Sequence, residues 1–227
     1  AATRLAIIGM GKTGARELNV LSDVDVIWVH DADESLAEDR AAMVAQALAR
    51  EATAGCMEPS REPMLWEVDA NLRPEGKDGV LTRTLASHVA YYERWARSWE
   101  FQALLKARAV AGDAELGAAY EEAVRSKVWQ SSSREGFVES VQRMRERVTD
   151  HIPADEVDWQ LKLGPGGLRD VEFTIQLLQL VHGATDEHVR QRGTLEAIDA
   201  LLEAGMIGRL EAGEFADDYR LLRVLEH

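Results

Sequence analysis

The chain has 227 residues, of which 46% are hydrophobic, and its 26 Lys and Arg against 40 Asp and Glu give a formal net charge of −14. That length is enough to bury a sizeable core, whereas the negative charge disfavours a nucleic-acid polymer or an anionic membrane as a partner. The single cysteine, Cys56, excludes an intramolecular disulfide, and because no apolar run approaches ~18 residues and no signal peptide is recognisable, we expect a cytoplasmic protein.

Strand signals are confined to the first third of the sequence. Short apolar runs, two of them alternating with a period of two, predict strands at 4–8, 24–30 and 65–72. Between the last two runs, a helical pattern with early acidic residues begins at Glu34 and predicts a helix that covers one face of a sheet. The sequence starts with Ala rather than Met and stops within an apolar helical pattern, so we expect a piece of a longer polypeptide.

From Thr84 onward the pattern is helical throughout. Its first segment spans 85–110 and carries four aromatic residues at a helical spacing that favours a place in the core: Tyr91, Tyr92, Trp95 and Trp99. Glycine and proline divide the later segments. The fold class expected is therefore α+β, with a small mixed β-sheet and its helices over 1–112, followed by an all-helical domain over 113–227.

The stretch "GMGKTG" has the G-x-G-x-x-G spacing of a dinucleotide-binding turn, and Asp31 lies where such a site needs an acid for the ribose. However, eight residues separate Gly14 from Asp23. A crossover between two parallel strands usually needs about a dozen residues or more. A nicotinamide-dependent oxidoreductase is therefore an alternative that this spacing disfavours.

Paired carboxylates explain more of the same stretch. Asp23 and Asp25 are two residues apart on an expected strand, so their side chains leave the same face of the sheet, and Asp69 lies within the expected strand 65–72, between Val68 and Ala70. Converging carboxylates repel each other unless a divalent cation lies between them, and Mg²⁺ suits oxygen ligands shared with phosphates. The alternative is a turn-capping Asp23 and an exposed Asp25. The nearby Lys12 and Ser22, with the third acid, favour the metal site.

Four segments in order resemble the glutamine synthetase adenylyltransferase/adenylyl-removing enzyme family, a bacterial branch of the polymerase-β-type nucleotidyltransferases. They are "GMGKTGARELNVLSDVDVIWV", "VDANLRPEGKDG", "YYERWARSWEFQALLKARAVAGD" and "LKLGPGGLRDVEFTIQLLQLVHG". Thr13 and Leu21 depart from the usual pattern without removing an expected ligand. The first and last segments are more similar to the amino-terminal, adenylyl-removing half of such enzymes, especially in actinobacteria.

This resemblance implies roles for individual residues. The catalytic, metal-binding acids would be Asp23, Asp25 and Asp69. The residues lining the phosphates would be Gly11, Lys12, Ser22 and Arg73. The edge of the site would include Glu100, Lys106, Arg108, Arg169, Asp170 and Glu172, for which an ion-pair face of a helix or an acidic helix N-terminus is the alternative interpretation.

The reaction implied is removal of AMP from an adenylylated tyrosine of glutamine synthetase by phosphorolysis, with Mg²⁺ or Mn²⁺ as cofactor and ADP as product. Adenylylation of the same tyrosine from ATP is the alternative, because both reactions need the same acids. Glutamine synthetase is the expected partner, and a nitrogen-regulatory signalling protein is implied for the full-length enzyme. A non-catalytic helical docking module is the remaining hypothesis, which the intact acids disfavour.

Overall fold

The computed structural model describes residues 3–20, 22–32, 37–59, 63–64, 66–150 and 152–226, with the side chain of residue 158 left out. The chain divides into two compact units, Ala1–Lys127 and Val128–His227. The division falls inside helix α5 (Ala114–Trp129), and the separate domains expected on either side of residue 112 stay a prediction. None of the described helices is long and apolar enough to cross a membrane.

The first unit is built on a small mixed sheet, which confirms the expected α+β class. Strands β1 (Arg4–Gly9) and β2 (Val24–Asp31) pair antiparallel, and β5 (Arg108–Gly112) pairs antiparallel with the other edge of β1. Strands β3 (Val68–Asp69) and β4 (Thr82–Thr84) both run parallel to β2. The sheet order is therefore β3-β2-β1-β5, with β4 also on β2. The strand expected at 65–72 is only two residues long, and its position 65 lies outside the described residues.

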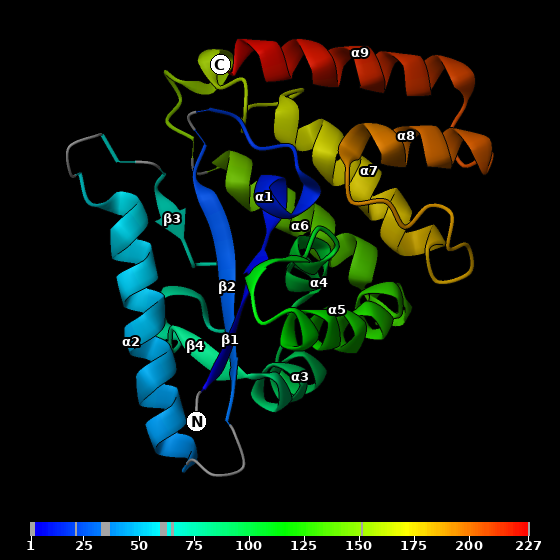
Figure 1. The fold of residues 1–227 in the computed structure, drawn as a ribbon. Helices are drawn as coiled ribbons and strands as arrows, with labels where there is room; N and C mark the ends of the chain where they lie inside the picture. The colour runs from blue at the N-terminus through cyan, green and yellow to red at the C-terminus, as the bar shows by residue number, and fades with distance from the viewer. Residues whose placement is uncertain are drawn as a thin grey trace. The chain divides into compact units, whose positions relative to one another are not determined.

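Helix α2 (Glu38–Met57) covers one face of this sheet, as expected (Figure 1). It packs through alanines on one stripe, and the core beneath it contains Val26 and Trp28 of β2 together with Ala49. Helix α3 (Leu85–Arg94) lies on the other side of the sheet from α2 (Figure 1). There the buried hydroxyls of Tyr92 and Tyr120 lie 3.0 Å apart.

The continuous helix expected over 85–110 is wrong. The segment forms α3, a second helix α4 (Ser98–Leu104) and strand β5, because pairing with β1 outweighs the helical pattern of the last residues. The core placement of the aromatic set is also wrong for Trp95, which directly follows α3 and is 73% exposed. Tyr92 of the same set is buried, as expected.

The described part of the second unit contains helices and no strand. Its helices are α6 (Phe137–Asp150), α7 (Leu168–His182), α8 (Thr194–Glu203) and α9 (Arg209–Leu225). Helices α7, α8 and α9 share an apolar core that includes Ile175, Ile198 and Leu201. Short 3₁₀ turns in the two units are η1 (Gly76–Asp78), η2 (Ser131–Ser133) and η3 (Val157–Trp159).

Candidate active site

Two of the three expected catalytic acids are direct neighbours in the sheet. Asp25 of β2 is the register partner of Asp69 of β3 in a parallel pair. Side chains at paired positions of adjacent strands leave the same face, so these two half-buried carboxylates share one side of the sheet. The Asp69 carboxylate is held by the backbone N–H of Asn71, which donates to Oδ1 over 2.6 Å. Asp25 and Asp69, two of the acids expected in the site, are therefore adjacent on one face of the sheet.

Asp23 is placed differently. It lies just before β2 and is exposed. Among the residues that the structure describes, no group of three His, Cys, Asp or Glu side chains is arranged to hold a metal ion. The paired acids nevertheless fit a divalent cation, because Mg²⁺ is commonly bound by one or two carboxylates and completes its shell with water and substrate phosphates. The residues that would hold it are Asp25 and Asp69, and a metal-binding role stays a prediction for these two acids as it does for Asp23.

The glycine-rich turn lies against Asp25. It forms helix α1 (Gly11–Ala15), and the N–H of Met10 donates to the carbonyl of Asp25 over 2.9 Å. Gly11 has a φ of +48°, and a Cβ at this position would lie 2.7 Å from Oδ2 of Asp25. Glycine is thus required at residue 11 both by its backbone conformation and by the neighbouring carboxylate. Lys12 lies in α1 and Ser22 in the loop before β2, both half-buried.

The directions of β1 and β2 exclude the dinucleotide-binding alternative. A dinucleotide-binding unit needs two parallel strands joined by a crossover helix. Here β1 and β2 are antiparallel neighbours, and the connecting helix α1 has five residues. The glycine spacing therefore serves another purpose in this fold.

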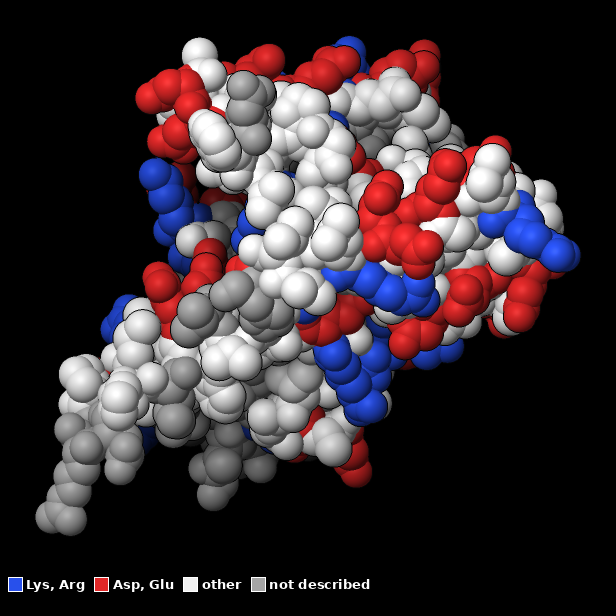
Figure 2. Space-filling view, turned by 90° about the horizontal axis from the view of Figure 1, so that it is seen from above, with Lys and Arg blue, Asp and Glu red and all other residues white. Residues whose placement is uncertain are grey.

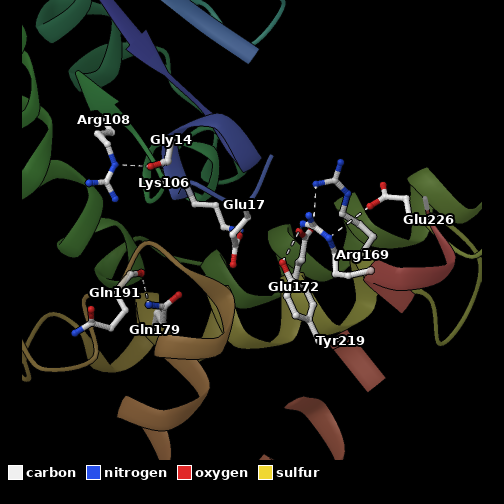
Figure 3. A network of polar contacts seen from close by, with 11 residues as sticks. Gly14, Glu17, Lys106, Arg108, Arg169, Glu172, Gln179, Gln191, Tyr219 and Glu226 are labelled. Carbon is white, nitrogen blue, oxygen red and sulfur yellow. Dashed lines mark hydrogen bonds and ion pairs between the residues drawn. The ribbon is translucent and has the colours of Figure 1, made fainter. Parts of the chain in front are cut away.

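That purpose is close packing of the turn against the start of β5. A Cβ on Gly14 would fall 2.0 Å from the carbonyl oxygen of Lys106, and Nε of Arg108 donates to the carbonyl of Gly14 over 2.6 Å. The Lys106 ammonium lies 2.9 Å from Oε2 of Glu17, and these side chains are 6% and 15% exposed. Figure 3 shows Lys106 directed toward Glu17 and Arg108 toward Gly14. Lys106 and Arg108, expected at the edge of the site, hold the turn.

Glu17 was missed by the sequence interpretation. A carboxylate within an apolar and glycine-rich stretch was the available signal, but its partner lies 89 residues away along the chain. The buried pair is costly to desolvate and depends on good geometry, so it fixes the turn in one position more than it adds stability.

Arg73 is engaged with the loop that follows Asp69. Its guanidinium donates to three backbone carbonyls, at 2.8 Å, 3.1 Å and 3.1 Å, of Ala70, Lys77 and Gly79. These bonds give the side chain a role in shaping the loop. A place beside the phosphates, implied by the family resemblance, stays a prediction.

Glu100 is almost fully buried at the start of α4. Its Oε1 accepts hydrogen bonds from the N–H of Arg97 at 2.9 Å and from the hydroxyl of Tyr91 at 3.2 Å. Burial raises the pKa of Tyr91, and the Glu100 carboxylate acts in the same direction, so the phenol remains a donor at neutral pH. Tyr91 was treated as a core residue in the sequence, and its polar contacts were missed.

The remaining expected site residues lie in the second unit. Asp170 forms an ion pair with Arg145 and accepts a hydrogen bond from the N–H of Gly166 at 2.7 Å. The Arg169 guanidinium lies 3.3 Å from the carboxylate of Glu172, which is buried (Figure 3). These contacts hold the glycine turn and the first turn of α7, in agreement with the helix N-terminus interpretation. A role at the acid pair stays a prediction for all three.

The charge of the surface agrees with the composition. On the face seen in Figure 2, Asp and Glu side chains are spread widely, and Lys and Arg side chains are interspersed among them. A protein that binds a nucleic-acid backbone presents a basic patch or stripe instead.

A mixed sheet that brings two aspartates together beside a glycine turn defines a nucleotidyltransferase-type domain. Comparison with known proteins agrees, since residues 1–123 match the family model described as glutamate-ammonia ligase adenylyltransferase. The chain belongs to this family. Residues 137–227 match a second family model, described as PII-uridylyltransferase.

Full-length relatives carry both activities in their names. The chain is 64% identical over 228 residues to the bifunctional glutamine synthetase adenylyltransferase/adenylyl-removing enzyme of Leifsonia xyli, covering 100% of this chain and 23% of the relative. Proteins of the same name from Streptomyces coelicolor and Mycobacterium tuberculosis are 56% and 54% identical, over 99% of this chain and 23% and 21% of theirs. The chain thus spans less than a quarter of the length of these relatives.

Proposed function

We propose that this chain removes AMP from an adenylylated tyrosine of glutamine synthetase by phosphorolysis. The observation that carries the proposal is the register pairing of Asp25 with Asp69, with Gly11 packed against Asp25. Membership of the adenylyltransferase family and the names of the relatives support the nucleotide and the protein substrate. The direction rests on the similarity of "LAIIGMGKTGARELN" and "LKLGPGGLRDVEF" to the amino-terminal half of such enzymes.

In this reaction an oxygen of inorganic phosphate forms a bond to the phosphorus of the AMP group. The bond from that phosphorus to the tyrosyl oxygen breaks, the tyrosyl oxygen takes up a proton, and ADP leaves. Catalysis of phosphoryl transfer consists mainly of positioning and charge stabilisation. A divalent cation held by Asp25 and Asp69 would supply that stabilisation when bound.

Other residues of the chain would bind the phosphate groups or hold the glycine turn in position. Lys12 and the backbone of the glycine turn would bind phosphate oxygens, while Glu17, Lys106 and Arg108 keep the turn against Asp25. Asp23 and Ser22 would complete the polar rim of the site. Mg²⁺ or Mn²⁺ is the proposed cofactor, and a nitrogen-regulatory protein is the proposed partner of the longer enzyme.

The test is ADP release from adenylylated glutamine synthetase in the presence of phosphate and Mg²⁺. Asp25→Asn and Asp69→Asn should each lower the rate by about 100-fold or more, since loss of a metal ligand removes several kcal/mol of charge stabilisation. Asp31→Asn is the matched control, because Asp31 lies at the other end of β2 and pairs with Arg4. Full activity of a folded Asp25→Asn protein contradicts the proposal.

Adenylylation from ATP is the second candidate, because the relatives carry both activities in one name. The site would then hold the departing pyrophosphate where phosphate enters in phosphorolysis. Incubation of unmodified glutamine synthetase with labelled ATP and Mg²⁺ distinguishes the two directions. Labelling without ADP release in the first assay reassigns the chain to the adenylylating reaction and leaves the acid pair in its role.

A further inference from the structure

The segment 70–79, which we call the acid loop, directly follows Asp69 and is internally hydrogen-bonded. The N–H of Asn71 holds the Asp69 carboxylate, and the guanidinium of Arg73 ties both ends of the segment through three backbone carbonyls. Backbone hydrogen bonds from Gly76 to Arg73 and from Gly79 to Gly76 add further turns. Movement of the acid loop would therefore carry the carboxylate of Asp69 with it.

Glu75 connects the acid loop to the rest of the first unit. Its carboxylate forms an ion pair with Arg83 of β4, and its N–H donates to the hydroxyl of Tyr91 over 3.4 Å. Glu75 has a φ of +64°, a left-handed conformation that is rare outside glycine and persists where surrounding contacts impose it. The guanidinium of Arg83 also lies 5.9 Å from the centre of the Tyr91 ring.

The direction of the hydrogen bonds is set by Glu100. The Tyr91 hydroxyl donates to Oε1 of Glu100 over 3.2 Å and therefore presents a lone pair to the N–H of Glu75. The backbone N–H of Arg97, which precedes α4, also donates to this oxygen of Glu100. A series of hydrogen bonds thus links the acid loop through the hydroxyl of Tyr91 to the Glu100 side chain on α4.

We propose that Tyr91 and Glu75 are positioning residues that hold Asp69 at its place beside Asp25 for binding of a divalent cation. The role of Asp69 in cation binding rests on the function proposed above. Asp69 belongs to a strand of only two residues, so strand pairing alone restrains it weakly. The hydrogen bonds that link Glu75, Tyr91 and Glu100 restrain the position of Asp69 further, from outside the sheet.

The variant that tests this is Tyr91→Phe, which removes the hydroxyl and keeps the ring. The matched control is Tyr120→Phe, because Tyr120 is also in the first unit and its hydroxyl bonds to Tyr92 and not to the acid loop. Tyr91→Phe loses the hydrogen bonds to Glu100 and Glu75, and Tyr120→Phe loses the one to Tyr92, so a loss of thermal stability is expected in each. Stability therefore does not separate a positioning role from a merely structural one, and two local measurements are needed.

The first measurement is amide hydrogen exchange of residues 71–79 in the metal-free 227-residue chain, and the second is calorimetric titration with Mn²⁺. Tyr91→Phe should speed exchange in the acid loop by about tenfold and weaken Mn²⁺ binding by a similar factor, with exchange in β1 unchanged. Tyr120→Phe should leave loop exchange and Mn²⁺ affinity at the wild-type values. In the ADP-release assay, Tyr91→Phe should raise the Mn²⁺ concentration needed for half-maximal rate, and excess Mn²⁺ should restore the rate.

Wild-type loop exchange in Tyr91→Phe overturns the proposal, as does an equal loss of Mn²⁺ affinity in both variants. Absence of Mn²⁺ binding by the wild-type chain also overturns it. A chain that binds Mn²⁺ and shows the expected difference between variants, yet releases no ADP, supports the positioning role while the proposed reaction fails. The two proposals are thereby separable.

Discussion

Replacement of Gly11 by alanine tests the contact between the glycine turn and the acid pair. The added Cβ would lie 2.7 Å from Oδ2 of Asp25, well inside the van der Waals separation of about 3.5 Å. In addition, the φ of +48° at this position places an L-residue in the left-handed region, at a cost of roughly 1–2 kcal/mol. The variant should therefore melt about 3–10 °C below the wild type, given the entropy of unfolding of a unit of this size.

The same variant should bind Mn²⁺ more weakly, because the carboxylate of Asp25 must turn away from the new methyl group. Gly55→Ala is the matched control. It lies within α2, nothing stands within 4 Å of its added Cβ, and alanine should stabilise the helix by about 0.5–1 kcal/mol. Thermal unfolding and Mn²⁺ titration of both variants form the assay. A Gly11→Ala protein with the melting temperature and Mn²⁺ affinity of the wild type would refute the reasoning.

Three further predictions concern the first unit. Lys106→Met should destabilise it by about 3 kcal/mol because the Glu17 carboxylate loses a buried ammonium, and the double variant with Glu17→Leu should recover part of that loss in urea unfolding. Burial lowers the pKa of His88 from its ordinary 6.5 to about 3, so its contribution to stability is complete above pH 6.5 and declines as the pH falls toward 3. Between pH 6.5 and 5 the free energy of unfolding of the wild type should fall by about 2 kcal/mol because of His88, and the His88→Gln variant should lose most of this pH dependence. A variant whose urea midpoint depends on pH as in the wild type contradicts this. Glu75→Gly and Glu75→Ala both lose the ion pair to Arg83. The glycine variant should nevertheless be about 1 kcal/mol more stable than the alanine variant, because glycine adopts the left-handed conformation of this residue without strain. Equal urea midpoints of the two variants would rule out strain at this residue.

The sequence predicted the local parts of this fold well. Strands β1 and β2 have clear apolar runs and were each predicted to within one residue of their observed bounds. The helical pattern predicted α2, although its expected start at Glu34 lies outside the described residues. Strand β5 was missed because "RAVAG" continues a helical pattern and becomes a strand only through pairing with β1, about 100 residues earlier in the chain. A stretch of about ten residues contains no signal of a strand partner that lies so far away along the chain.

The candidate site shows the same division. Alternation along one strand, a local property, predicted Asp23 and Asp25 on the same face, whereas the pairing of Asp25 with Asp69 depends on β3 lying beside β2. The engagement of Lys106 with Glu17, and of Arg73 with three carbonyls, depends on where the backbone returns to the site. Charged residues in a motif indicate that a site is near. They do not show which of them contacts the ligand and which stabilises the surrounding backbone.

The contact between the glycine turn and β5 also bears on how the protein is made. Arg108 follows Gly14 by 94 residues, so at synthesis rates of about 5–20 residues per second the turn waits on the order of 5–20 s for its packing partner. During that interval the edge of β1 that later pairs with β5 has no strand beside it, and such an edge readily pairs with another chain. A ribosome pausing before residue 108 would therefore prolong the stage at which the nascent chain is most prone to aggregate.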